Sequence, residues 1–286
     1  MKLLREQGIG DRGQPPIPYP FIILMSAITL SNEIIHYEVL GRGRPLVFLH
    51  GWVGSWRYWI PAMQAASVSF RAYALDLWGF GDTAKNPRYY SLQQQINLLE
   101  QFLGALGTGK ISLVGHGLGA IIALLYAVRR PELVDRLMAI GLPRMKNDLH
   151  PRLQKQTPEE LAGWLLGRGL QAEAACLEAP KADPRAVQHS LAGLQHIDLA
   201  CLPYHLSLPC LMVDGQNDPS VQSPPGRWSH RLPGHIHQVV FQGSGHFPML
   251  DSPRKFNRLL AGFLGQQAGA SPRQLQLKEE WKRRVR

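Results

Sequence analysis

The sequence predicts an α/β fold in which helices cover both faces of a mostly parallel sheet. Strand-like and helix-like segments alternate along most of the chain, and no internal repeat is visible. A chain of 286 residues with 45% hydrophobic residues is long enough for one large α/β domain and does not require two independent cores. We therefore expect a single core interrupted by one insertion.

The expected strands are short apolar runs bounded by turns. Pro45 to His50 is an almost continuous apolar run, which is typical of a strand buried on both faces. The expected strands are Ile34 to Leu40, Pro45 to His50, Phe70 to Leu77, Ile111 to Val114, Val134 to Ile140, Cys210 to Asp214 and His237 to Gln242.

Three helices are expected in the core. Leucines and an isoleucine recur at helical spacing between Leu92 and Leu106, and Ser91 with Gln94 forms a capping box before them. An apolar helix from Ala120 to Arg130 is stopped by Pro131. The third helix runs from about Pro253 to Gly265.

Between Pro143 and about Leu208 the strand pattern gives way to short helices. Thr157 and Asp183 each precede a proline, which is the usual opening of a helix. We expect an N-terminal extension at 1–27, an α/β core at 28–142 and 209–268, a helical cap at 143–208 and a basic C-terminal tail at 269–286. Met25 is a candidate initiator besides Met1, because the fold-like pattern begins only at Ile28.

The composition of the chain argues against nucleic-acid binding, a disulfide framework, a zinc site and a transmembrane segment. The net charge is +10, but the basic residues are spread along the chain and thicken only near the C-terminus, so no nucleic-acid groove is expected. Three cysteines without C-x-x-C spacing favour a reducing cytoplasm over a disulfide framework or zinc site. The apolar run Phe21 to Leu30 is too short to span a bilayer, so no transmembrane segment is expected. The oligomeric state is not indicated.

The pentad Gly115-His116-Gly117-Leu118-Gly119 lies between an expected strand and an apolar helix. It resembles a nucleophile elbow whose third position is changed, with small residues where the backbone is strained and closely packed. A phosphate-binding G-x-G-x-x-G turn is the competing interpretation, since Ala120 satisfies the relaxed last position. The pentad alone does not decide between them.

Three further motifs favour the elbow. His50-Gly51-Trp52 follows a strand and resembles an oxyanion loop, and Asp76 to Thr83 resembles the glycine-rich turn after the next strand. Gly215 to Val221 resembles a loop that carries a triad acid, and Gly243 to Leu250 one that carries a triad histidine. In this order the motifs resemble the α/β-hydrolase superfamily, in its cap-bearing, esterase- and epoxide-hydrolase-like branch, over roughly Ile28 to Gly265.

The resemblance implies an α/β-hydrolase fold and assigns site residues. Asp218 and His246 correspond to the acid and histidine of the triad, and Gly117 to the nucleophile position. Trp52 and Leu118 correspond to the residues whose backbone N–H groups form the oxyanion hole. The elbow residues are Gly115, His116 and Gly119.

Glycine at position 117 has no atom that can attack a carbon, and loss of the nucleophile lowers kcat in a triad enzyme by about a millionfold. We therefore expect a noncatalytic or weakly catalytic protein that binds a small apolar or ester-like molecule. Two alternatives stay open: an enzyme in which His246 and Asp218 act as general base on water or substrate, and a serine ester hydrolase disabled by a Ser-to-Gly change. A fourth interpretation keeps Asp218 and His246 only as structural parts of their loops.

The remaining candidates concern the ligand. His50, Gly51, Trp78 and Trp164 are expected to line the ligand site, whereas Trp56 and Trp59 are at least as well explained by core packing. His235 and His237 share one face of a strand, but no third ligand is apparent, so no metal is assigned. No cofactor is expected.

Overall fold

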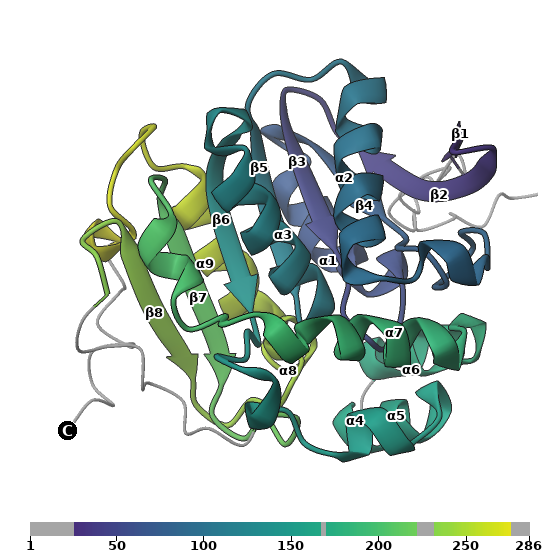
Figure 1. Ribbon diagram of the computed structural model, residues 1–286. Helices are drawn as coiled ribbons and strands as arrows, with labels where there is room; N and C mark the ends of the chain where they lie inside the picture. Colours follow the sequence, from purple (N-terminus) through teal and green to yellow (C-terminus); the bar gives the residue numbers. More distant parts are fainter. Residues whose placement is uncertain (1–25, 167–169, 222–231, 276–286) are drawn as a thin grey trace, which may run out of the picture.

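The computed structural model describes residues 26–166, 170–221 and 232–275. Their centre is one eight-stranded sheet with strand order β1-β2-β4-β3-β5-β6-β7-β8 (Figure 1). The pairs β1–β2 and β2–β4 are antiparallel, and every other pair is parallel. The strands are β1 (Ser26–Leu30), β2 (Glu33–Leu40), β3 (Arg44–Leu49), β4 (Phe70–Leu75), β5 (Ile111–His116), β6 (Val134–Ile140), β7 (Cys210–Gly215) and β8 (Ile236–Phe241).

Helices cover both faces of this sheet. On one face α2 packs against α3, and on the other α1 packs against α9 (Figure 1). The α-helices are α1 (Ile60–Ala66), α2 (Leu92–Leu106), α3 (Leu118–Arg129), α4 (Arg152–Lys155), α5 (Pro158–Leu165), α6 (Leu170–Glu178), α7 (Pro184–Ala192), α8 (Pro248–Asp251) and α9 (Pro253–Leu264). The predicted fold class, a mostly parallel sheet with an inserted helical cap, is confirmed.

The antiparallel edge of the sheet extends upstream of the expected core. Ser31 and Asn32 both have positive φ, at 51° and 61°, which matches the right-handed twist of a tight hairpin between β1 and β2. Ser26 and Ala27 pair with Tyr37 and His36. The described structure therefore starts in a strand two residues before the expected start of the core at residue 28. Most of the expected N-terminal extension, residues 1–25, lies outside the described residues, as does the end of the C-terminal tail, residues 276–286.

The ends of two strands differ from expectation by two residues, each for a local reason. β4 ends at Leu75 instead of Leu77, because the Leu77 N–H donates to Nε2 of His50 over 3.0 Å and not to a neighbouring strand. β5 continues past Val114 to His116, which pairs with Ile140 of β6. The sheet thus holds the first two residues of the elbow.

Between β6 and β7 the described elements are all helical, and they form the cap across the carboxyl ends of the strands (Figure 1). Thr157 and Glu160 form a complete capping box at the start of α5, and the Asp183 side chain caps α7. Two of the buried contacts between cap and core involve α6 and α7. The Ser55 hydroxyl donates to Glu178 of α6, and the indole N–H of Trp52 donates to Ser190 of α7.

Candidate active site

The elbow joins β5 to α3 at the carboxyl ends of the parallel strands. Gly117 has φ 51° and ψ −112°, a strained conformation that L side chains rarely adopt. Its N–H donates to the carbonyl of Ile140, and the Gly119 N–H donates to the carbonyl of His50. These bonds fix the turn to the ends of β6 and β3.

The glycines of the elbow differ in the space around them. A Cβ atom on Gly115 would lie 2.3 Å from the carbonyl oxygen of Gly119, and one on Gly119 would lie 2.3 Å from that of Leu49. A Cβ on Gly117 would meet nothing closer than Cε3 of Trp52, at 3.4 Å, which is ordinary van der Waals contact. Packing therefore demands glycine at 115 and 119 but leaves room for a side chain at 117.

The predicted acid and histidine lie in direct contact. Nδ1 of His246 is 2.8 Å from Oδ2 of Asp218, and the two side chains are 3% and 8% exposed. Burial alone would raise the pKa of Asp218, but the charge and hydrogen bond of His246 hold that pKa below its ordinary value. Asp218 can hold the imidazole in one orientation, as the acid of a catalytic triad does.

Ser220 joins this pair and was not among the residues predicted from the sequence. Its hydroxyl lies 2.7 Å from Oδ1 of Asp218 and 2.9 Å from Nδ1 of His246, and its backbone N–H donates to the same carboxylate oxygen. The sequence did contain a signal for it, because an aspartate side chain commonly accepts from the backbone N–H two residues later, where Ser220 stands. Gly141, at the end of β6, was also missed, and a Cβ there would lie 3.4 Å from Cε1 of His246.

The oxyanion loop is held by His50. The Leu77 N–H donates to Nε2 of His50, so the proton lies on Nδ1, which donates to the Gly51 carbonyl over 2.8 Å. Burial lowers the pKa of His50, which keeps the ring neutral and this tautomer in place. The Gly51 carbonyl belongs to the same peptide group as the Trp52 N–H, so this bond fixes the direction of the predicted oxyanion donor.

A second buried chain of hydrogen bonds links the oxyanion loop to the histidine loop. The Gly51 N–H donates to the Tyr58 hydroxyl, which lies 3.0 Å from Nδ1 of His116. Nε2 of His116 donates to the carbonyl of His246 over 2.9 Å. Burial, together with nearby His246, holds the pKa of His116 well below its ordinary value. A neutral ring of this tautomer accepts from Tyr58 and donates to His246, so every bond in the chain is satisfied.

The predicted lining residues do not all gather at the elbow. The Trp52 side chain is the nearest neighbour of the Gly117 position. Trp78 stacks on Tyr89 at 4.6 Å, and both its backbone polar groups bond to Gln95. Trp164 lies in the cap against His150. Trp56 and Trp59 are buried in the core.

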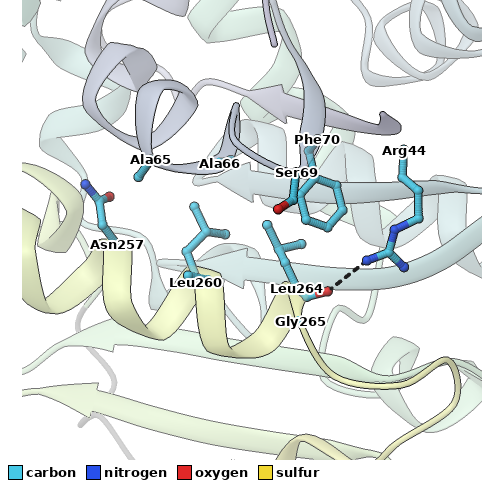
Figure 2. Close-up of a pocket in the computed structure, with 10 residues that line it drawn as sticks. Arg44, Ala65, Ala66, Ser69, Phe70, Asn257, Leu260, Leu264 and Gly265 are labelled. Atoms are coloured by element: carbon cyan, nitrogen blue, oxygen red, sulfur yellow. Dashed lines mark hydrogen bonds between the residues drawn. The ribbon is translucent and has the colours of Figure 1, made fainter. Parts of the chain in front are cut away.

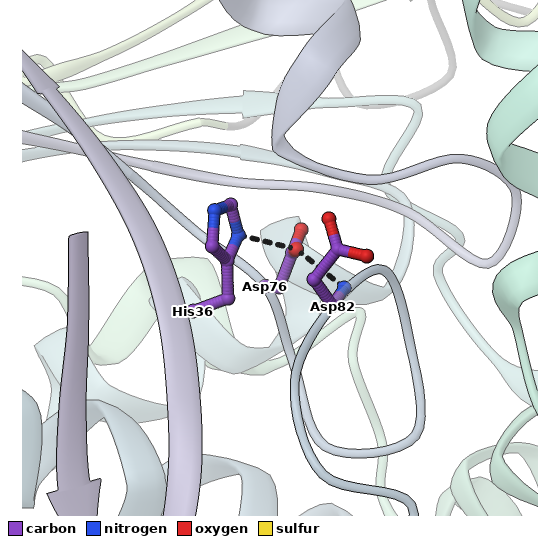
Figure 3. Close-up of side chains that lie close together, drawn as sticks. All are labelled: His36, Asp76 and Asp82. Atoms are coloured by element: carbon purple, nitrogen blue, oxygen red, sulfur yellow. Dashed lines mark hydrogen bonds and ion pairs between the residues drawn. The ribbon is translucent and has the colours of Figure 1, made fainter. Parts of the chain in front are cut away.

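A polar cluster lies at the base of the glycine-rich turn (Figure 3). Oδ2 of Asp76 accepts from Nδ1 of His36 over 2.8 Å and from the Asp82 N–H over 3.0 Å, and Oδ1 accepts from the Trp56 N–H. Burial alone would lower the pKa of His36, but the hydrogen bond and charge of Asp76 raise it. Ligand atoms of His36, Asp76 and Asp82 lie within 4.8 Å of one another. Because Asp76 is satisfied by protein donors and Asp82 pairs with Lys181, we interpret the cluster as a structural support.

A small cavity lies at the other end of the sheet, where β3 and β4 begin (Figure 2). It has a volume of about 170 Å³ and lies between α1 and α9. Arg44 lines it, stacks over the Phe70 ring and donates to the carbonyl of Leu264. The Arg44 guanidinium already has an acceptor in the last turn of α9. The cavity lies at the opposite end of the strands from the elbow, so it is not part of the candidate active site.

Comparison with known proteins places these features in a family. The sequence pattern of the alpha/beta hydrolase family matches residues 46–259, which span the oxyanion loop, the elbow, the cap and both dyad loops. The chain belongs to the alpha/beta hydrolase family. The predicted resemblance is thereby confirmed, while the roles assigned to single site residues stay predictions.

Relatives within this family catalyse several reactions. A pimeloyl-[acyl-carrier protein] methyl ester esterase from Nitrosomonas europaea is 24% identical over 254 residues, which cover 78% of this chain and 96% of the relative. A soluble epoxide hydrolase from Corynebacterium sp. (strain C12) is 32% identical over 113 residues, which cover 40% of each chain.

Solved structures share the fold. A serine-to-glycine variant of an N-acyl homoserine lactonase, in complex with N-hexanoyl homoserine lactone, superposes with a TM-score of 0.73 at 23% identity, covering 85% of this chain and 97% of the lactonase. E-2-(acetamidomethylene)succinate hydrolase has a TM-score of 0.70 at 22% identity, covering 85% and 100%. Among the described residues of this family member, no helix is long and apolar enough to cross a membrane.

Proposed function

We propose that this chain binds a small apolar, ester-like molecule over Gly117 and turns it over slowly or not at all. One observation carries the proposal: a glycine occupies the nucleophile position while the dyad, the elbow backbone and the oriented oxyanion loop around it keep the arrangement of a hydrolase site. Such a site retains ligand-orienting groups but lacks the atom that would form an acyl-enzyme. The lactonase variant supports this, because a serine-to-glycine protein of this fold was solved with a lactone bound.

A second candidate function follows from the dyad itself. His246 and Asp218 are in hydrogen-bond contact at 2.8 Å, so the imidazole can take a proton from water or from a substrate without a serine. General-base catalysis contributes roughly 10²- to 10⁴-fold, so such an enzyme is slower than a triad hydrolase but measurable. Turnover by such an enzyme requires His246. The binding function, by contrast, requires no turnover.

A panel of esters, lactones and epoxides, assayed on the native chain and on Gly117→Ser side by side, tests these functions. The binding proposal predicts saturable binding by the native chain, measured by thermal shift and calorimetry, with no turnover. Turnover by the native chain that disappears in His246→Ala contradicts it and establishes the dyad enzyme. Turnover only in Gly117→Ser, with labelling by a serine-directed fluorophosphonate, identifies a hydrolase disabled by one change. Failure of every panel member to bind refutes the proposal.

A further inference from the structure

Two backbone N–H groups at the elbow are available to a ligand. Within the described parts of the chain, neither the Trp52 N–H nor the Leu118 N–H has an acceptor. Leu118 is the first residue of α3, a helix of 12 residues, so its N–H lies at the positive end of the helix dipole. The Trp52 N–H is fixed in direction by the bond from His50 to the Gly51 carbonyl. Both donors favour an oxygen that carries negative charge.

A third donor is the dyad histidine. Asp218 and Ser220 occupy Nδ1 of His246, and within the described residues Nε2 has no hydrogen-bond partner. The side chain is only 3% exposed, and the His246 ring centroid lies 4.4 Å from that of His116, the neighbour of Gly117. The His246 ring therefore lies beside the elbow histidine, and Nε2 is its nitrogen without a partner among the described residues. Asp218 can balance the charge of a second proton on this ring, and with that proton in place Nε2–H would donate to a ligand oxygen.

The missing side chain at Gly117 makes room for a second ligand oxygen. A Cβ at Gly117 would touch nothing closer than 3.4 Å. In a serine enzyme the hydroxyl lies between the oxyanion donors and the histidine. Without it, one oxygen of a bidentate group can accept from the Trp52 and Leu118 N–H groups while the other accepts from His246. An ester carbonyl supplies only the first of these oxygens as a strong acceptor.

On the basis of the function proposed above, we propose that this site binds a carboxylate with an apolar tail more tightly than an uncharged, ester-like molecule of the same shape. Burial lowers the pKa of both His50 and His116, so these two rings are neutral and add no charge that would compete with His246 for the ligand. A carboxylate that accepts from the two backbone N–H groups, and from a His246 ring protonated on binding, would receive charge-assisted hydrogen bonds, which are roughly twice as strong as neutral ones. The site then selects its ligand by charge, and the Trp52 ring beside Gly117 offers an apolar surface to the tail.

Calorimetric titration with hexanoate and with hexanamide, which matches it in shape but has no charge, tests the proposal. We expect the native chain to bind hexanoate about tenfold more tightly than hexanamide. His246→Gln should bring this ratio close to one, and Gly117→Ser should reduce it because the hydroxyl takes the place of the second oxygen. Arg44→Gln removes a positive charge at the far end of the sheet and should leave the ratio unchanged.

The outcomes separate the two proposals. Equal or tighter binding of hexanamide overturns the carboxylate assignment and leaves the apolar binding function standing. A ratio that falls as much in Arg44→Gln as in His246→Gln also overturns it, because the net charge of the chain would then explain the preference. If hexanoate and hexanamide both fail to bind while an ester, lactone or epoxide of the panel binds, the carboxylate assignment fails and the binding function stands. If none of these compounds binds, both proposals fail.

Discussion

Replacing each elbow glycine with alanine in turn should give three variants of very unequal stability, with Gly117→Ala the most stable of them. At Gly115 and Gly119 the new methyl group would lie 2.3 Å from a backbone carbonyl oxygen, which cannot move without displacing β3 or α3. At Gly117 the closest atom is 3.4 Å away, so the main cost is the backbone strain of a non-glycine residue at φ 51°.

The magnitudes follow from these two causes. Strain at a positive φ costs about 1–3 kcal/mol, so Gly117→Ala should unfold at a Tm lower by several degrees. Overpacking against backbone costs about 3 kcal/mol or more, and we expect Gly115→Ala and Gly119→Ala to lose most of their soluble expression or to unfold at much lower urea concentration.

Urea unfolding followed by tryptophan fluorescence, with circular dichroism to confirm the native fold, measures all three variants. The reasoning is refuted if Gly117→Ala is destabilised as much as Gly119→Ala, because the spacing at position 117 would then not accept a side chain. The same result would remove the basis for expecting Gly117→Ser to fold.

Three further predictions test the supports around the site. His50→Phe leaves the Leu77 N–H and Gly51 carbonyl without partners, so we expect a loss of about 2–4 kcal/mol in urea unfolding; a loss below about 0.5 kcal/mol contradicts the clamp. Burial raises the pKa of Asp214 to about 6, so the folded state loses stability as pH rises from the ordinary carboxyl pKa to about 6. Asp214→Asn should therefore be more stable than the native chain near neutral pH, by about 1–2 kcal/mol, with the gain vanishing in acid; a gain independent of pH would count against this assignment. Asp76→Ala removes the buried acceptor of three donors and should cost about 3 kcal/mol or more in thermal unfolding, unlike Asp82→Ala, whose side chain is a partly exposed partner of Lys181; equal losses would show that Asp76 is not the support.

The order of motifs along the chain was enough to predict the fold and the contact between two of the candidate site residues. A glycine-rich turn between a buried strand and an apolar helix, followed by an acid loop and a histidine loop, predicted the contact between Asp218 and His246 across a sequence separation of 28. This works because parallel strands place their carboxyl ends at one edge of the sheet, so loops that follow different strands meet there. The glycine at position 117 was also readable directly from the sequence.

Only the tertiary structure shows which groups orient the residues of the candidate site. Nothing in local sequence pairs Tyr58 with His116, or Ser190 with Trp52, because these partners are far apart in the chain and their hydrogen bonds depend on side-chain packing. His50 was expected to line the ligand site, but both its ring nitrogens are engaged by the backbone. Only the assembled fold shows that Gly115 and Gly119 have no room for a side chain whereas Gly117 has, because that space is set by atoms of β3, α3 and the oxyanion loop.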